Sequence, residues 1–102
     1  MSKFGLYNKI PTQPGKRDAL VGILLEVAAF MQLVSGCDLY LVNVSASEPD
    51  TVWVTEVWES SEAHQASLRL DRSKAAMKRG MPLIAGPVES IKLVPIGGKG
   101  LS

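Results

Sequence analysis

The sequence predicts an α+β protein in which a four-stranded antiparallel sheet carries its helices on one face. Three observations lead to this class: four segments are patterned as strands, two regions have helical spacing, and their order along the chain is β-α-β-β-α-β. The chain has 102 residues, of which 46% are hydrophobic and 21% are charged. That length suits one hydrophobic core rather than two. We therefore expect a single domain over residues 1–102, with a flexible, glycine-rich tail from about residue 97.

The first strand is expected over Phe4–Ile10, where the two sides of the chain alternate with a period of two residues. A segment rich in proline and glycine then ends it. A helix is expected from about Lys16 to Val34, because leucine, isoleucine, valine and methionine recur there at helical spacing. Its apolar surface is so wide that we expect other elements to cover it on more than one side. A membrane span is not expected, since the apolar part is shorter than the roughly 20 residues that a bilayer requires and contains Glu26.

The two middle strands are expected over Asp38–Ser45 and Thr51–Glu59, which are rich in Val, Leu, Tyr, Trp and Thr. The polar segment Ser47–Asp50 between them predicts a tight turn and therefore an antiparallel hairpin. Both sides of these strands are apolar or aromatic, whereas a sheet with one face in water would alternate more cleanly. We therefore expect the second sheet face to pack against another copy of the chain, in a homodimer whose interface includes Trp53 or Tyr40.

A second helical region is expected after Ser60 or Ser61, either of which can cap its first turn. It should cover Ala63–Leu70 and, after a break, continue over Arg72–Met81. The last strand is expected over Val88–Pro95. A four-stranded sheet with this order of elements is the split, ferredoxin-like arrangement.

Composition and charge exclude several functional classes. The formal net charge is +1, and no block of arginine and lysine interleaves with aromatic residues, so nucleic-acid binding is not expected. Cys37 is the only cysteine, so no internal disulfide can form, and no cysteine–histidine set with zinc spacing is present. No signal peptide is apparent. We therefore expect a soluble, cytoplasmic protein without a metal site.

Several short motifs occur in a distinctive order. Asn8 ends a strand, Pro14-Gly15-Lys16 precedes the long helix, Ser35-Gly36-Cys37 follows that helix, and Glu56–Ser60 leads into Glu62-Ala63-His64. In this order and spacing, from Phe4 to about Ile96, the chain resembles the antibiotic biosynthesis monooxygenase family. The resemblance implies homodimers whose sheets pack into a dimeric α+β barrel, with a pocket between each sheet and its helices. Some members of the family oxygenate phenols or quinols with dioxygen and no cofactor, and others degrade haem.

The haem-degrading branch is matched only in part. Asn8 corresponds to its asparagine in the first strand. The branch's tryptophan falls at Ser67, however, and its haem-ligating histidine falls at Met77, a residue that we expect in the core. The resemblance therefore gives haem binding or degradation the least support.

The branch that oxygenates polyketide phenols is also matched in part. Trp58 corresponds to a tryptophan of its pocket, and His64 falls where those enzymes have a tyrosine. The asparagine of their third strand is replaced by Val54. The resemblance therefore implies the fold more firmly than the reaction.

The candidate site residues combine one titrating group with one amide. His64 is the only histidine, and as a base it could take the proton of a phenol to form the phenolate that dioxygen attacks; the alternative is a partly exposed residue of the first helical turn. Asn8 faces the helices, where its amide needs a partner, either a substrate oxygen or a side chain of a neighbouring strand. Glu56 is expected to pair with Lys92 or an arginine rather than to act as a base. The predicted site consists of catalytic Asn8 and His64 and a substrate pocket formed by Trp58, Phe30, Leu68 and Glu56.

Three functional hypotheses follow. The first is a monooxygenase that needs no cofactor and acts on a small aromatic phenol or quinol with dioxygen. The second is a non-catalytic dimeric module that binds a small apolar molecule, which the replacements at Val54 and Ser67 would favour. The third is haem binding or degradation.

Overall fold

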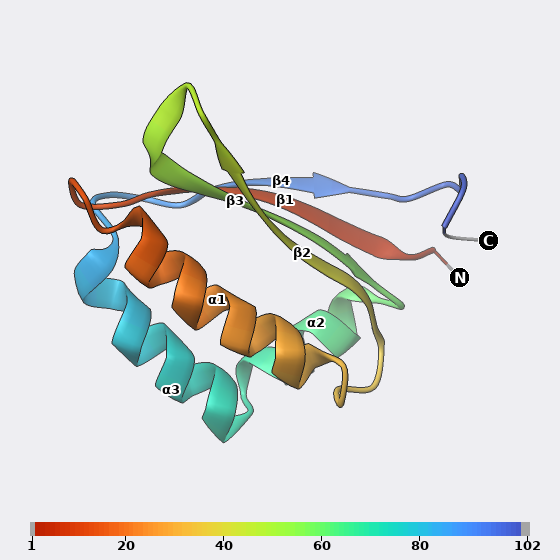
Figure 1. Cartoon of the computed structure of the whole chain (residues 1–102). Helices are drawn as coiled ribbons and strands as arrows, with labels where there is room; N and C mark the ends of the chain where they lie inside the picture. Colours follow the sequence, from red (N-terminus) through yellow and green to blue (C-terminus); the bar gives the residue numbers. More distant parts are fainter. Residues whose placement is uncertain (1, 101–102) are drawn as a thin grey trace.

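The computed structural model describes residues 2–100; residue 1 and residues 101–102, which include the end of the expected tail, lie outside the described residues. The α+β class and the order of elements are confirmed, with the second helical region divided in two as expected (Figure 1). The elements are β1 (Phe4–Pro11), α1 (Arg17–Met31), β2 (Cys37–Ser45), β3 (Glu48–Trp58), α2 (Ser61–Leu68), α3 (Asp71–Gly80), the 3-10 helix η1 (Met81–Leu83) and β4 (Glu89–Leu93).

The sheet has the strand order β2-β3-β1-β4 and every pair is antiparallel. The helices all lie on one side of it (Figure 1). A core cluster of Ile10, Leu20, Val52 and Val54 lies between the sheet and α1. α1 contacts β2 and β3 on one side and α3 on another, which confirms the expectation of cover on more than one side.

The outer sheet face is the side of the sheet without helices. Tyr7 and Lys9 stand on either side of the buried Asn8 in β1. Because side chains alternate along a strand, Tyr7 and Lys9 point to this outer face. Trp53 belongs to it and stacks on Tyr7 with ring centroids 5.6 Å apart. The large apolar side chains that this face exposes by 37–57% are Tyr7, Leu39, Leu41, Ile91 and Leu93.

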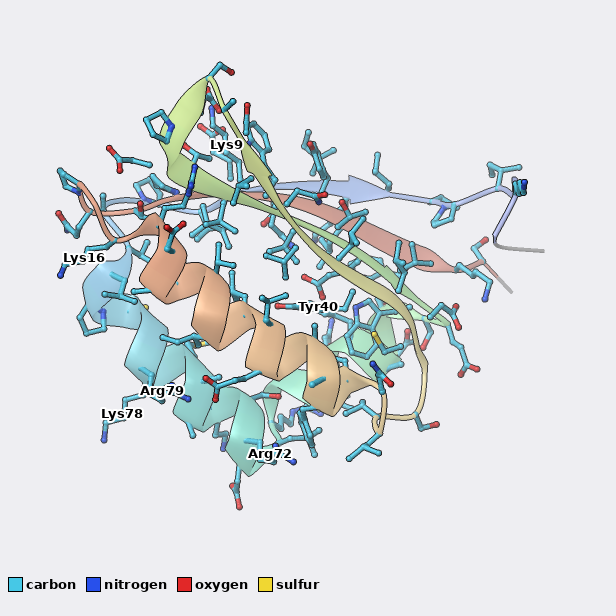
Figure 2. All side chains as sticks on the ribbon, in the orientation of Figure 1. Lys9, Lys16, Tyr40, Arg72, Lys78 and Arg79 are labelled. Atoms are coloured by element: carbon cyan, nitrogen blue, oxygen red, sulfur yellow. The ribbon has the colours of Figure 1, made fainter. Side chains whose placement is uncertain are left out.

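Tyr40 lies on the opposite, inner face. Figure 2 shows it between β2 and α1, and its ring packs against the core cluster. Tyr40, one of the two residues named for the expected dimer interface, therefore lies on the helix side of the sheet, because the register of β2 directs its side chain there. Trp53, the other residue named for that interface, lies on the outer sheet face.

The turn of the central hairpin differs from the expectation. Ser45 pairs with Glu48, so the turn consists of residues 46–47 and β3 begins three residues earlier than predicted. Pro49 is tolerated in this strand because it lies in the irregular stretch between Glu48 and Val52, where β3 has no register partner on β2, and because β1 pairs with β3 only as far as Thr51. Polar composition marked the segment correctly as the hairpin end but placed the turn too late.

Candidate functional site

The site begins with the first turn of α2. The Ser60 hydroxyl accepts a hydrogen bond from the Ala63 backbone nitrogen at 3.1 Å and so caps the helix. Of the two serines that the sequence offered, Ser60 is therefore the cap. His64 lies within this anchored turn, and 17% of its side chain is exposed. The cap fixes the backbone from which the imidazole projects toward the sheet.

Glu56 is the centre of the polar network. Its carboxylate accepts hydrogen bonds from Asn8 Nδ2 at 2.8 Å and from Trp58 Nε1 at 3.0 Å, and its Oε1 lies 3.8 Å from His64 Nε2. The residue is only 9% exposed, and a buried carboxylate requires such donors. The prediction that Glu56 pairs with Lys92 or an arginine is wrong, because β1 lies between Lys92 and β3.

Asn8 is buried, and neighbouring strands satisfy both ends of its amide. Its nitrogen donates to Glu56 Oε2, and its oxygen accepts a hydrogen bond from the Ser90 hydroxyl at 2.7 Å. Ser90 is its direct register partner on β4, whereas Glu56 is a diagonal neighbour on β3. Of the two partners considered for this amide, the structure supplies the neighbouring strand side chain. Asn8 therefore holds the carboxylate in place.

Two of the predicted pocket residues lie outside the cavities described below. Trp58 is fully buried behind Glu56, and its ring meets the His64 ring edge-on at 5.5 Å between centroids. Phe30 lies under the Arg72 guanidinium, 4.5 Å from its ring centroid, at the contact between α1 and α3. The sequence showed a wide apolar stripe on α1 but not which of its residues face the sheet, so it could not indicate that Phe30 lies on the side of α3.

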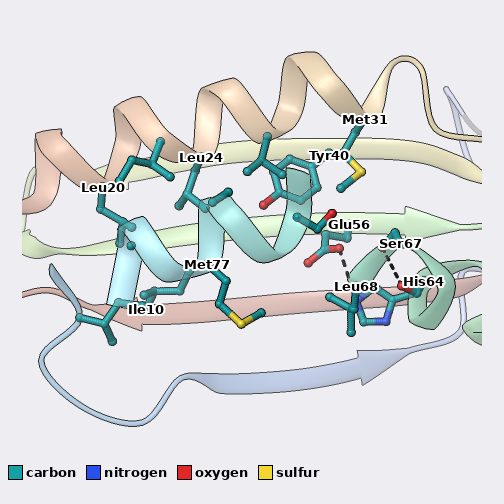
Figure 3. A pocket seen from close by; sticks show the side chains of 16 residues that line it. Ile10, Leu20, Leu24, Met31, Tyr40, Glu56, His64, Ser67, Leu68 and Met77 are labelled. Carbon is teal, nitrogen blue, oxygen red and sulfur yellow. Dashed lines mark hydrogen bonds and ion pairs between the residues drawn. The ribbon is translucent and has the colours of Figure 1, made fainter. Parts of the chain in front are cut away.

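Two cavities meet at Glu56 and His64. The helix cavity, about 190 Å³, lies between the sheet and the helices and is lined mainly by apolar side chains of α1 and α3 (Figure 3). The strand cavity, about 450 Å³, lies along β1 and β4 and includes Asn8 and Ser90. The residues that line both cavities are Ile10, Tyr40, Glu56 and His64. Leu68 lines the helix cavity.

Tyr40 is the site residue that sequence analysis missed. It is the register partner of Glu56 on β2. Burial raises the pKa of its hydroxyl, and the neighbouring Glu56 and Cys37 raise this pKa further. The hydroxyl therefore stays protonated at neutral pH and can act as a hydrogen-bond donor. Strand alternation could have placed Tyr40 beside Glu56, but the apolar residues on both sides of β2 obscured which side faces the helices.

The haem-related positions also have defined places. Met77 lines the helix cavity and is 56% exposed, so the expectation that it belongs to the core is wrong. Ser67 is buried and donates a hydrogen bond to the His64 backbone oxygen. Among residues 2–100, no group of three or more His, Cys, Asp or Glu side chains is placed to hold a metal ion. None of the helices in the described part of the chain has the length and apolar character of a membrane span.

A mainly apolar cavity lined by a carboxylate, an imidazole and a phenol, inside a ferredoxin-like α+β domain, is typical of modules that bind small molecules. Residues 4–79 match the family model described as antibiotic biosynthesis monooxygenase. The chain belongs to this family.

Solved structures agree with this assignment. A proposed antibiotic biosynthesis monooxygenase from Chloroflexus aurantiacus J-10-fl is 43% identical, with a TM-score of 0.90 over 99% of this chain and 100% of that one. A second, from Caulobacter crescentus CB15, is 25% identical, with a TM-score of 0.87 over 94% and 92% of the two chains. Rv0793 from Mycobacterium tuberculosis shares the fold at 19% identity, with a TM-score of 0.84 over 96% and 99%. No curated protein sequence matches the chain.

Proposed function

We propose that the protein is a cofactor-independent monooxygenase that oxidises a small aromatic phenol or quinol with dioxygen. One observation carries the proposal: the imidazole of His64 and the carboxylate of Glu56 lie 3.8 Å apart at the polar end of a mainly apolar cavity. Such a cavity suits a flat apolar ring, and its polar end suits one hydroxyl group. Membership of the family supports an oxygenase reaction at the level of the class.

In the proposed reaction, the substrate ring occupies the helix cavity beside Leu68 and its hydroxyl faces His64. His64 takes the phenolic proton, and the imidazolium that forms is stabilised by Glu56, which Asn8 and Trp58 hold in place. The phenolate is electron-rich and supplies the electrons for the reduction of dioxygen. In an anthrone-like substrate, the ring CH₂ group then becomes C=O: one oxygen atom enters the product, and the other leaves as water with the two hydrogens of the CH₂ group. The balance needs no reductant other than the substrate.

The outer sheet face supports a homodimer as the working form. Its exposed apolar side chains come from β1, β2 and β4, and Tyr7 stacks on Trp53 of β3. Exposed apolar surface of this extent favours a protein partner. Obligate interfaces typically bury about 2,000 Å² or more. We propose that a second copy of the chain covers this face.

A non-catalytic binding module is the second candidate. The pairing of both ends of the Asn8 amide favours it, because an amide that is already satisfied gains little by contacting a substrate. Haem binding or degradation is a weaker candidate, since Ser67 and Met77 replace the tryptophan and the ligating histidine of that branch.

Oxygen uptake distinguishes these candidates. The parent protein and His64→Ala are compared with hydroquinone and anthrone, and Glu62→Gln, an exposed carboxylate on the same helix, is the matched control. The proposal expects uptake by the parent and the control and a loss in His64→Ala. Saturable binding of these compounds without uptake by the parent would favour the binding module instead.

A further inference from the structure

The Tyr40 hydroxyl has no part in the reaction proposed above. Tyr40 and Glu56 are register partners on β2 and β3, and both side chains point toward the helices. Figure 3 shows the Tyr40 ring and the Glu56 carboxylate projecting from neighbouring strands into the same space beneath α1, with His64 beside the carboxylate. One cavity therefore presents a hydrogen-bond donor and a proton acceptor to whatever it binds.

The two groups have opposite hydrogen-bonding roles. The Glu56 carboxylate accepts two hydrogen bonds, from Asn8 Nδ2 and Trp58 Nε1. Burial and the adjacent carboxylate raise the pKa of Tyr40, so this hydroxyl keeps its proton. The Ser73 hydroxyl lines the helix cavity as well, and within residues 2–100 it is buried without a hydrogen-bond partner. The cavity thus has donor capacity that the protein itself does not use.

We infer that the site catalyses proton transfer in its own right, namely the conversion of a cyclic ketone to its phenol tautomer without dioxygen. Tyr40 donates a hydrogen bond to the ketone oxygen, where negative charge develops, while the Glu56–His64 pair accepts the proton from carbon. A preorganised donor at a developing oxyanion is among the largest single contributions to catalysis. The inference rests on the site and the substrate class of the proposed function, but it does not require oxygen chemistry.

The reaction is balanced. The C–H bond breaks, and its proton passes to the Glu56–His64 pair. The electron pair of that bond forms the new ring C=C bond, while the C=O π pair moves to oxygen, which takes up a proton from water. The pair then returns its proton to water. Tyr40 keeps its own proton throughout, and the substrate is neither oxidised nor reduced.

Deuterium exchange under strictly anaerobic conditions tests the inference. Anthrone in D₂O exchanges its CH₂ protons through the phenol tautomer, and proton NMR follows their loss with and without protein. The expected result is exchange above the buffer rate in the parent and a loss of about 10²–10³-fold in Tyr40→Phe, which removes one donor and keeps the ring. Tyr7→Phe is the matched control, because it makes the same change on the outer sheet face. We expect it to keep the parental rate.

The possible outcomes separate the inference from the proposed function. Exchange without oxygen uptake would support the inference and overturn the monooxygenase. Uptake without protein-dependent exchange would do the reverse. Equal rates in Tyr40→Phe and the parent would overturn the role of Tyr40. Should Tyr40→Phe fail to fold, Glu56→Gln takes its place, and the inference is overturned if that variant exchanges at the parental rate.

Discussion

Replacing Glu56 by glutamine should separate activity from stability. The glutamine oxygen can accept from Trp58 Nε1 as the carboxylate does. Its amide nitrogen can donate to the Asn8 oxygen if the Asn8 amide turns over, and the Asn8 nitrogen can then donate to the Ser90 hydroxyl, which accepts as readily as it donates. Every buried group stays paired, so we expect the free energy of unfolding to remain within about 1 kcal/mol of the parent.

The effect on turnover should be large. The carboxylate lies 3.8 Å from His64 Nε2. At an effective dielectric constant of about 20, a charge at that distance stabilises an imidazolium by about 4 kcal/mol, which is an upper bound. Glutamine removes that charge while preserving the shape of the site. If proton transfer to His64 limits the rate, kcat should fall by up to about 10³-fold, while KM should change little.

The measurements are oxygen uptake and chemical denaturation of the parent, Glu56→Gln and the exposed Glu59→Gln as control. Glu56→Ala provides the contrast, because it leaves the donors of Asn8 and Trp58 without their acceptor and should cost at least about 1–3 kcal/mol. Parental turnover in Glu56→Gln would refute the reasoning. So would a loss of stability as large as that of Glu56→Ala, since the carboxylate would then be a structural requirement.

Four further predictions concern the base, the assembly, the pH dependence and haem. His64→Ala should lose about 10²–10⁴ in rate and recover in part at alkaline pH, where phenolates form in solution, whereas Asn8→Ala should be impaired at every pH; parental rates in His64→Ala across the range would remove the histidine from the mechanism. Analytical ultracentrifugation should show a homodimer at micromolar concentration, and Trp53→Asp should shift it toward monomer; a monomeric parent contradicts this. Because burial raises the pKa of Tyr40, the folded chain holds that proton more tightly than the unfolded chain. The resulting stability is complete below the unfolded pKa of about 10 and is lost as pH rises above it. The free energy of unfolding should therefore decline less steeply at alkaline pH in Tyr40→Phe than in the parent. Equal slopes in the two proteins would count against a raised pKa of Tyr40. Haemin titration should give no saturable one-to-one Soret change, and saturable binding with product formation under a reductant would reverse the ranking of functions.

Strand periodicity predicted on which face of the sheet a site residue lies, but not its hydrogen-bond partners. The alternation around Asn8 placed its side chain correctly on the helix-covered face. Its hydrogen-bond partners depend on the register of β1 against β3 and β4, because a shift of the register changes every cross-strand neighbour. Residue spacing within one strand does not contain that register. The pairing of Glu56 with Asn8 and Trp58 could therefore not be derived from the sequence.

Helix periodicity had a similar limit. The repeat of apolar residues predicted α1 but was too wide to say which residues face the sheet and which face α3. Phe30 was therefore assigned to the pocket, although it packs under Arg72. Tyr40 was missed for a related reason, since both sides of β2 are apolar. Where a pattern is apolar on all sides, the tertiary neighbours decide which side is buried.

The alternation along β1 has a consequence for how this protein can change over time. Asn8 lies on the cavity side of the sheet, whereas the next residue on either side belongs to the outer sheet face. Alternate residues of this one central strand therefore form two different surfaces. A substitution in β1 can change one of these surfaces without changing the other. Inserting a single residue would reverse the side of the sheet on which neighbouring side chains lie, placing Tyr7 in the cavity and Asn8 on the outer sheet face. Insertions should therefore be tolerated in the hairpin turn at residues 46–47 and lethal to activity within β1.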